Sequence, residues 1–344
     1  MLGVVIHAPH DLRVEPVTIT PPGPGDVTVR IEAGGICGSD LHYFHHGGFG
    51  AIRIKQPMVL GHEIAGVIAA VGTDVTHLKP GQRVAVDPSL PCRACRYCRE
   101  GNPRHCLDMR FMGSAMRFPH VQGGFRQSLT VSAEQAIAIP DSMTMAEAAM
   151  AEPLAVCLHA VSQAGPLLGR RVLVTGCGPI GILTIIAAKL AGASEIVATD
   201  LSAYTLGVAA LNGATTILNV ATTPDALAAY ATDKGHFDVM FEASGAAPVL
   251  RGAFDALRPG AIIVQVGIGS DVTLPLNVLV AKEFQLRGTF RFDREFQLAV
   301  DLMGSGRIDV KPLVTDTLPI AEAAAAFHRA SDRQHAMKVQ LSFA

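Results

Sequence analysis

A glycine-rich segment near the middle of the chain restricts the fold more than any other feature. Gly176-Cys177-Gly178-Pro179-Ile180-Gly181 matches the pattern GxGxxG, follows the apolar run RVLVT and precedes the apolar stretch ILTIIAAKLAG. A strand, a tight glycine turn and a helix in this order form the start of a dinucleotide-binding unit. Gly176 permits the turn, Gly178 lets a pyrophosphate approach the backbone, and Gly181 lets the helix pack on the strand.

The chain around this segment alternates between strand and helix patterns. Continuous apolar strands separated by helices indicate a parallel sheet that is covered on both faces. The strand candidates are 171–175, 195–199, 215–218, 237–242, 261–266 and 285–288. Six such strands predict a doubly wound parallel sheet of the Rossmann type over residues 147–288.

Residues 1–146 show a different sequence pattern, in which short β-type runs are separated by Pro-Gly turns. The runs are 27–32, 63–71, 83–86 and 135–139, and a helix is expected over 145–164. This pattern is typical of a β-barrel. The residues after 288 are too few for a third domain, so we expect 289–344 to return and complete the first one. The predicted fold class is α/β, a β-rich domain plus a Rossmann sheet.

Composition excludes several classes of partner. The net charge is −2 over 344 residues, without a basic stripe, so nucleic acid is not an expected partner. The most apolar stretch, 172–193, contains glycines, a proline and Lys189, and it is expected to be a strand and helix rather than a membrane span. The first residues lack a basic segment and a cleavage site, which favours the cytoplasm.

Asp200 follows the next predicted strand, at the distance from the glycines at which a carboxylate can hold the ribose hydroxyls of NAD. The same carboxylate would repel the 2′-phosphate of NADP. The residues after it, Leu201-Ser202-Ala203-Tyr204, include no cation that could bind that phosphate. NAD is therefore the expected cofactor, with NADP possible. The alternative is that Asp200 caps a helix or forms a turn with Ser202.

Four cysteines lie close together in the sequence. They follow the pattern CxxCxxCx₇C and are Cys92, Cys95, Cys98 and Cys106. Four thiolates complete a tetrahedral zinc shell without any other ligand, so a structural zinc is expected here. The arginines in between, Arg93, Arg96, Arg99 and Arg104, could offset the negative charge. Cys157 and Cys177 lie outside this group and are interpreted as buried apolar residues.

A second metal site is indicated by Cys37, in GGICGSDLH, and His62, in VLGHEIAG. A catalytic zinc has three protein ligands and one open position. Two carboxylates, Glu63 and Glu152, compete for the third place. A zinc ion acting as a Lewis acid lowers the pKa of an alcohol, which can then give hydride to a nicotinamide ring.

Two polar residues follow Cys37 closely. Ser39 and His42 are suited to relay the proton that the alcohol loses, through the cofactor ribose to solvent. In the alternative interpretation, Ser39 is a turn residue and His42 is a solvated histidine.

These motifs together resemble the medium-chain, zinc-containing alcohol and polyol dehydrogenases. ICGSDLHYF, LGHEIAGVI, the four cysteines, EPLAV and GCGPIG occur in the order of that family, over essentially the whole chain. EPLAV favours the sorbitol-dehydrogenase branch over the simple alcohol dehydrogenases, which use a cysteine as the third zinc ligand. DMRFMGSAMRFPHVQGGF and LRGTFRF are similar to the members of that branch that act on L-idonate.

The resemblance implies a GroES-like catalytic domain, a Rossmann domain and two zinc ions per chain. It implies that Cys37 and His62 bind the catalytic zinc with Glu63 in the resting state. Glu152 would bind the zinc-bound water or exchange with Glu63. A homodimer or homotetramer is expected.

The resemblance also implies a substrate pocket lined by Tyr43, Phe290 and Arg291, for a sugar acid or a polyol. A guanidinium can hold a carboxylate by two parallel bonds, or it can bind hydroxyl groups, so Arg291 is compatible with either substrate. Further candidates for the carboxylate are Arg110, Arg117 and His120.

Overall fold

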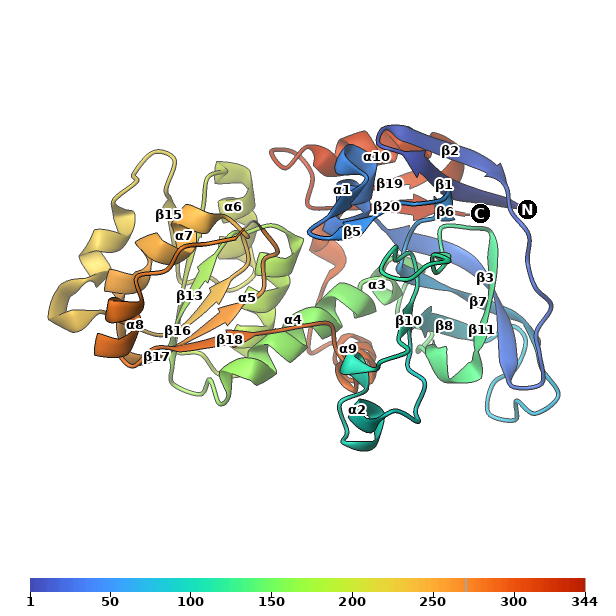
Figure 1. Cartoon of the computed structure of the whole chain (residues 1–344), viewed down its shortest axis with the longest axis horizontal. Coiled ribbons are helices and arrows are strands. Elements are labelled where there is room, and N and C mark those ends of the chain that lie inside the picture. Colours follow the sequence, from blue (N-terminus) through green and yellow to red (C-terminus); the bar gives the residue numbers. More distant parts are fainter. Residues whose placement is uncertain (270, 344) are drawn as a thin grey trace. The chain divides into compact units, whose positions relative to one another are not determined.

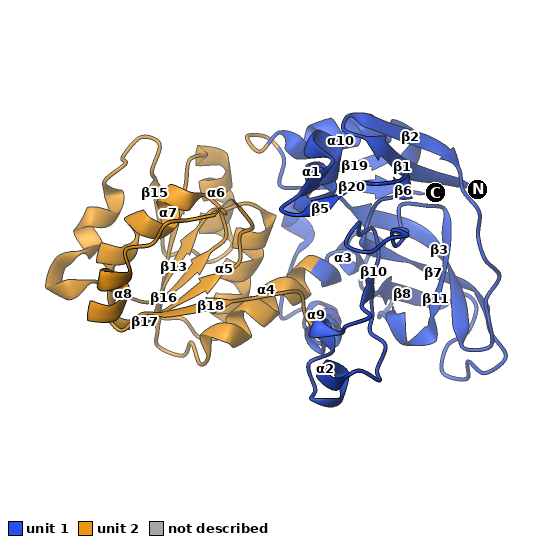
Figure 2. Cartoon of the chain, viewed as in Figure 1, with its two compact units in different colours: residues 1–152, 293–332, 336–344 blue, residues 153–292, 333–335 orange. Residues whose placement is uncertain are grey.

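The computed structural model describes residues 1–269 and 271–343. The chain splits into two compact units (Figure 2). Unit 1 comprises residues 1–152, 293–332 and 336–344, and unit 2 comprises 153–292 and 333–335. The domain boundaries expected at 146/147 and 288/289 stay predictions, since compactness alone does not define a folding domain.

Unit 1 is built around a seven-stranded sheet with the order β12-β8-β7-β3-β20-β19, and β11 also pairs with β3 (Figure 1). The strands β3, β7, β8, β11 and β12 all pair antiparallel with their neighbours. The C-terminal strand β20 pairs antiparallel with β3, so the end of the chain shares a sheet with its beginning.

The helices and strands of unit 1, apart from short 3-10 turns, are β1 (Leu2–Ala8), β2 (Asp11–Pro16), β3 (Asp26–Gly35), α1 (Gly38–His46), β4 (Gly48–Phe49), β5 (Ile52–Arg53), β6 (Met58–Val59), β7 (Glu63–Val71), β8 (Arg83–Val86), β9 (Ser89–Leu90), α2 (Arg96–Arg99), β10 (Arg110–Phe111), β11 (Ser128–Ser132), β12 (Ala136–Ala138), α3 (Met145–Ala148), α9 (Glu295–Gly304), β19 (Val314–Pro319), α10 (Ala323–Ser331) and β20 (Lys338–Ser342).

Unit 2 contains a six-stranded parallel sheet with the order β15-β14-β13-β16-β17-β18. This is the strand order 3-2-1-4-5-6 of the Rossmann fold. The strand β16 (Phe237–Glu242) is buried along its whole length, as a strand covered on both faces must be. One face packs in a core cluster that includes Leu250 of α7 and Val278 of α8.

The helices and strands of unit 2, again apart from 3-10 turns, are β13 (Arg171–Thr175), α5 (Pro179–Leu190), β14 (Glu195–Asp200), α6 (Ala203–Leu211), β15 (Thr216–Asn219), β16, α7 (Ala247–Gly252), β17 (Leu257–Gln265), α8 (Leu276–Ala281) and β18 (Gln285–Gly288). The helix α4 (Ala151–Ala164) begins in the last residues of unit 1 and continues in unit 2. All six predicted strands of the parallel sheet are confirmed, with small changes at their ends.

The single helix expected over 145–164 is wrong. The structure has two helices, α3 and α4, with a break at residues 149–150. Pro153 explains the break, because its ring would clash with the carbonyl of Ala149 in a continuous helix. In the first turn of α4 the proline needs no helical N–H partner and fits without strain.

The apolar stretch 172–193 forms β13 and α5, as expected. Over residues 1–269 and 271–343, the structure has no helix with the length and hydropathy to cross a membrane.

Candidate active site and metal centres

Three potential metal ligands come together in unit 1, where β3 ends and β7 begins. Gly35 of β3 pairs with Glu63 of β7, which places the Cys37 loop beside His62. The ligand atoms of Cys37, His62 and Glu63 all lie within 4.8 Å of one another. A side chain on Gly35 would collide with the Glu63 carboxylate, so the glycine makes room for this ligand.

Asp40 holds the two loops of this trio together. Its carboxylate accepts the N–H of Cys37 at 3.0 Å and the N–H of Gly61 at 3.2 Å. Asp40 Oδ1 also lies 3.9 Å from Nδ1 of His62. That nitrogen is buried without a hydrogen-bond partner. Metal-binding histidines direct their outer nitrogen at a carboxylate, so this arrangement leaves Nε2 to face a metal.

Glu63 forms a buried ion pair with Lys338 of β20. Nζ of Lys338 lies 2.8 Å from each carboxylate oxygen, and the two side chains are 3% and 1% exposed. Nζ also donates to the carbonyl of Ile36 at 3.3 Å. Burial acts to lower the pKa of Lys338, but the charges of Glu63 and Cys37 outweigh it, so the pKa is raised. The lysine fixes the carboxylate beside Cys37 and His62.

Glu152, in the first turn of α4, is also buried. Burial, followed by the negative charges of Glu63 and Cys37, raises its pKa to about 8, although His62 acts in the opposite direction. Glu152 therefore interacts electrostatically with the trio. Among the described residues, however, the group of mutually close ligand atoms contains Glu63 and not Glu152.

The donor set fits zinc. A thiol, an imidazole and a carboxylate are its protein ligands, and three of them leave a position open. Burial, followed by the Glu63 charge, raises the pKa of the Cys37 thiol to about 12. A bound divalent cation would reverse this effect, because a coordinating thiol is deprotonated.

The four cysteines of the lobe lie within 4.8 Å of one another and form no disulfide. Sγ of Cys95 lies 3.6 Å from Sγ of Cys98 and 4.0 Å from Sγ of Cys106. A Zn–S bond of about 2.3 Å gives tetrahedral S···S edges of about 3.8 Å. The spacing in the structure therefore fits a Zn(Cys)₄ site.

Backbone N–H groups donate to these sulfur atoms, and the charge of Arg96 interacts favourably with Cys95. The N–H of Cys95 donates to Sγ of Cys92 at 3.3 Å, and the N–H of Asp108 donates to Sγ of Cys106 at 3.3 Å. Backbone hydrogen bonds from Cys98 and Leu107 lower the pKa of Cys95 to about 6.

The arginine side chains of the lobe make other contacts. Arg93 pairs with Glu134, Arg96 lies over the ring of Tyr97, and Arg104 donates to Asn102.

The predicted relay residues lie on α1. The Ser39 side chain hydrogen-bonds to Cys37 and acts to lower the pKa of its thiol. The half-buried ring of His42 lies 5.7 Å from that of Phe49. Tyr43 is 1% exposed and belongs to the core of unit 1, and its hydroxyl accepts the N–H of Ala115 at 3.0 Å.

Phe290 and Arg291 belong to unit 2. The Arg291 guanidinium lies 4.8 Å from the centre of the Phe290 ring, and that ring is 42% exposed. Arg291 has a positive φ of 53°. The guanidinium therefore lies over a partly exposed aromatic ring.

Two of the further residues expected to bind the substrate carboxylate are already bonded to other groups of the protein. Arg117 donates to the carbonyls of Met109 and Leu107 and pairs with Asp108 at 2.7 Å. His120 accepts the N–H of Lys55 at 2.8 Å, while its other ring nitrogen is bonded to the carbonyl of Arg117. Arg117 bonds within its own segment, whereas His120 links that segment to Lys55. Arg110 is exposed.

The glycine motif lies where β13 ends, at the point where the strand order of the sheet reverses. Gly176 has a φ of 86°, and Gly178 precedes α5, which begins at Pro179. A side chain on Gly181 would collide with the carbonyl of Gly176. Gly178 caps α5, and a helix N-terminus that follows such a glycine turn can receive a pyrophosphate.

Asp200 Oδ2 accepts the N–H of Cys177 at 2.6 Å, and Oδ1 accepts the N–H of Ser202 at 2.9 Å. The cap of α6 is Ser202 and not Asp200. The turn with Ser202 is therefore present. The bond to Cys177 also places the carboxylate beside the glycine motif, as a ribose-binding residue requires.

Three important residues were not predicted. Asp40 could have been found, because it lies three residues after the Cys37 cap, where a carboxylate completes a capping box. Lys338 had no local signal, since its partner is distant in the sequence. Glu242, at the end of β16, binds the backbone of Ser244 and Gly245 and the amide of Gln265. It fixes the loop that faces Gly176.

Two family models match the chain. The model of the alcohol dehydrogenase GroES-like domain matches residues 23–141, and that of the zinc-binding dehydrogenases matches 179–305. L-idonate 5-dehydrogenase (NAD(P)(+)) of Escherichia coli K12 is 43% identical over 92% of this chain and 91% of that protein. Sorbitol dehydrogenase of Gallus gallus is 39% identical over 99% of this chain and 96% of that protein.

Solved structures of similar proteins lead to the same family. The crystal structure of L-idonate 5-dehydrogenase from Escherichia coli superposes with a TM-score of 0.95 at 41% identity, over 99% of this chain and 97% of that one. That of 2R,3R-butanediol dehydrogenase from Bacillus subtilis has a TM-score of 0.89 at 30% identity, over 99% of both chains. The chain therefore belongs to the NAD(P)-dependent, zinc-containing medium-chain alcohol dehydrogenases, within their sorbitol and idonate branch.

Proposed function

We propose that this protein oxidises L-idonate to 5-keto-D-gluconate with NAD(P)⁺, or catalyses the reverse reduction. The observation that carries the proposal is the buried carboxylate of Glu152 in EPLAV, which interacts electrostatically with Cys37, His62 and Glu63. Simple alcohol dehydrogenases use a cysteine as the third zinc ligand in place of this segment's glutamate. The resemblance to the idonate enzyme over nearly the whole chain supports the same substrate. The reaction converts one CH–OH group to C=O, transfers a hydride to the nicotinamide and releases one proton.

Unit 1 supplies the groups that handle the alcohol. Cys37, His62 and Glu63 would hold the zinc, and Glu152, which interacts electrostatically with them, would bind the zinc-bound water or exchange with Glu63. The metal, when bound, supplies a Lewis acid that favours loss of the hydroxyl proton. Ser39 lies next to Cys37 and would accept this proton, and His42 would pass it to solvent.

Unit 2 supplies the groups for the cofactor. The backbone at Gly176, Gly178 and Gly181 would receive the pyrophosphate, and Asp200 the ribose hydroxyls. The absence of a cation at residues 201–204 supports a preference for NAD⁺. We further propose that unit 1 is the catalytic domain and that unit 2 is the cofactor-binding domain.

The four cysteines of the lobe would hold a second, structural zinc, as their spacing indicates. A homodimer or homotetramer and a cytoplasmic location remain part of the proposal. The seven cysteines form no disulfide, which supports a reducing compartment.

A second candidate is a polyol dehydrogenase for sorbitol or xylitol. It is favoured by the resemblance to sorbitol dehydrogenase over 99% of the chain. In that case Arg291 would bind hydroxyl groups instead of a carboxylate.

A side-by-side assay of L-idonate, other aldonates, sorbitol and xylitol, each with NAD⁺ and NADP⁺, tests the proposal. We expect the highest kcat/KM with L-idonate and NAD⁺. A much higher kcat/KM with sorbitol would establish the polyol function instead.

A further inference from the structure

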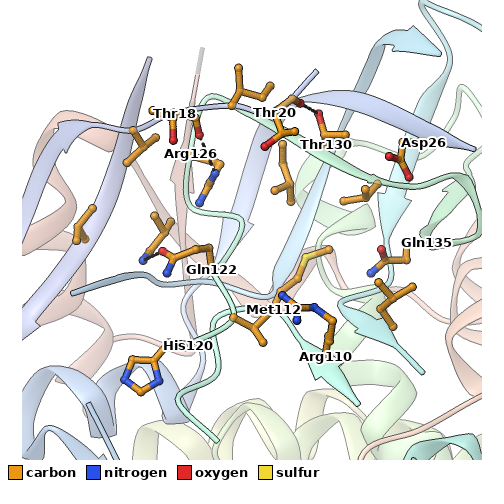
Figure 3. A pocket seen from close by; sticks show the side chains of 18 of the residues that line it. Thr18, Thr20, Asp26, Arg110, Met112, His120, Gln122, Arg126, Thr130 and Gln135 are labelled. Carbon is orange, nitrogen blue, oxygen red and sulfur yellow. Dashed lines mark hydrogen bonds between the residues drawn. The ribbon is translucent and has the colours of Figure 1, made fainter. Parts of the chain in front are cut away.

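A pocket of about 760 Å³ opens in unit 1, away from the residues assigned to catalysis (Figure 3). Its walls come from the segment after β2, from β11 and from residues 110–126. The volume lies within the range of about 300–1,000 Å³ that is typical of small-molecule sites.

Arg126 gives this pocket its chemical character. The residue is 8% exposed, and its guanidinium points into the pocket (Figure 3). Nε donates to the carbonyl of Gly123 at 3.1 Å and one terminal nitrogen donates to the carbonyl of Thr18 at 3.3 Å. No carboxylate of the described residues pairs with it. Burial lowers the pKa of Arg126, and a buried cation without an anion is costly.

Two further donors face the same space. Arg110, on β10, points its guanidinium into the pocket from another wall (Figure 3) and has no acidic partner among the described residues. Gln122 accepts the N–H of Val59 through Oε1 at 2.8 Å, which leaves its NH₂ group to donate. Two arginines and an amide together match the oxygens of a carboxylate.

The two acidic residues of the wall, Glu15 and Asp26, form no ion pair with these arginines. Glu15 lies 3.0 Å from Nε2 of His7, and Asp26 accepts the N–H of Gly23 at 3.0 Å. His120 also lines the pocket, but both of its ring nitrogens are bonded to backbone groups. Both carboxylates keep their negative charge, and the positive charge of the pocket is concentrated at Arg126 and Arg110, neither of which they bind.

The pocket is separate from the metal trio, although both adjoin β10. The ring of Phe111 lies 5.6 Å from that of His62. Its neighbours Arg110 and Met112 line the pocket instead, whereas none of Cys37, His62 and Glu63 lines it. A ligand in this pocket is thus not the molecule that reacts at Cys37 and His62.

We propose that this pocket binds a small hydroxylated carboxylate, with Arg126 and Arg110 on the carboxylate oxygens. Arg126 can form two parallel bonds with one carboxylate and gains the counter-ion that the protein itself does not provide. The exposed hydroxyl groups of Thr18 and Thr20 can bond to those of the ligand. Val5, Met112 and other apolar side chains enclose its carbon chain. The inference does not depend on whether L-idonate is the substrate of the catalytic site.

Calorimetric titration with D-gluconate tests the inference, using the zinc-loaded protein and its Cys37→Ser variant, in which the catalytic site is disabled. We expect one site per chain to remain in Cys37→Ser. In that background Arg126→Met should raise Kd at least tenfold, and Arg110→Met about three- to tenfold. Arg30→Met is the matched control, since Arg30 is exposed and pairs with Glu32. It should leave Kd unchanged.

Sorbitol and inorganic phosphate complete the design. Sorbitol lacks the carboxylate and phosphate lacks the carbon chain, so each should bind at least tenfold more weakly than D-gluconate. The inference is overturned if D-gluconate does not bind to Cys37→Ser at millimolar concentrations. Equal affinity in the Arg110→Met variant and the Arg30→Met control, or binding of sorbitol or phosphate as tight as that of gluconate, would also overturn it. Arg110 is exposed, so its variant keeps the test decisive if Arg126→Met fails to fold.

Discussion

Lys338 and Glu63 form an ion pair that is almost completely excluded from solvent. Removing one member of a buried pair is far more costly than the pair itself is stabilising, because the remaining charge has no partner. The pair also lies against the proposed metal ligands. Its loss should therefore have different consequences in the metal-free and the zinc-loaded protein.

Lys338→Met should lower the free energy of unfolding of the metal-free protein by roughly 3–5 kcal/mol. The loss should be smaller with zinc bound, since the cation can balance the Glu63 carboxylate. Chemical denaturation with and without zinc measures both values. Lys311→Met is the control, because Lys311 pairs with Glu147 while 61% exposed. Equal losses in the two forms would show that Glu63 does not reach the metal.

Asp200 accepts two backbone hydrogen bonds beside the glycine motif. Asp200→Ala removes these acceptors and the proposed ribose contact, so Kd for NAD⁺ should rise by about 10- to 100-fold, or roughly 1.4–2.8 kcal/mol. The preference over NADP⁺ should fall as well, because the repulsion of the 2′-phosphate is lost. Calorimetric titrations with NAD⁺ and with NADP⁺ measure the two affinities. Asp225→Ala, an exposed carboxylate of the same unit, should bind as the wild type does. An unchanged Kd in Asp200→Ala would falsify the ribose role.

The carboxyl group of Asp87 should make the free energy of unfolding depend on pH. Burial raises the pKa of this carboxyl group from 3.8 to about 7, with a smaller contribution from Asp293. Between these pH values the folded protein keeps a proton that the unfolded chain has lost, so the free energy of unfolding falls as the pH rises. Relative to Asp87→Asn, the wild type should lose roughly 1–3 kcal/mol from pH 4 to pH 7.

Urea denaturation at several pH values measures this difference. Asp74→Asn, at an exposed carboxylate, should follow the pH dependence of the wild type. Parallel pH profiles for the wild type and Asp87→Asn would mean that Asp87 titrates normally in the folded protein.

The cysteine lobe, residues 92–106, contains one short α-helix. Its only buried residues are Pro103 and Cys106. Such a segment needs a metal to be ordered, because too little apolar surface is buried to offset its conformational entropy. Cys98→Ser should therefore lose one zinc per chain and increase hydrogen exchange in the lobe.

Metal analysis and hydrogen-exchange mass spectrometry measure these effects. Cys157→Ser is the control, because Cys157 is a buried thiol outside both clusters, and it should retain two zinc ions. If Cys98→Ser also kept two zinc ions, the four-cysteine site would be excluded.

The turns and helix ends follow local rules that the sequence shows, but not all of them were recognised. Thr144 and Glu147 form a capping box at the start of α3, and Cys37 and Asp40 form one at α1. Pro153 ended the predicted long helix for a local steric reason. Boundaries of this kind are readable from sequence when capping and proline positions are considered together with apolar periodicity.

Both proposed zinc ions would bind the folded chain, so their removal should lower the stability of the whole molecule. A ligand that binds only the folded state adds RT ln(1 + [L]/Kd) to its stability. Treatment with a strong chelator should abolish activity and lower Tm by several degrees. Adding back two equivalents of zinc should restore both. An unchanged Tm in the metal-free protein would contradict a structural zinc.

The strand order of the parallel sheet agrees with the prediction because each of its elements carries its own signal. β13 and β16 are mostly apolar, and the glycine motif marks the turn between β13 and α5. Right-handed crossovers then leave few ways to arrange such units. The fold class was therefore predictable without any long-range information.

The sequence by itself determined the fold class, the two groups of metal-binding residue types and the glycine turn, because each depends on residues that are close in the chain. Only the tertiary structure decided which distant side chains meet. It brought Lys338 to Glu63 and placed Asp40 between the two loops of the metal trio. It also directed Arg110 and Arg126 into one pocket, and it bonded Arg117 and His120 to backbone carbonyl groups. Long-range pairing of this kind depends on strand register and on the packing of elements far apart in sequence, for which a single sequence carries no local signal.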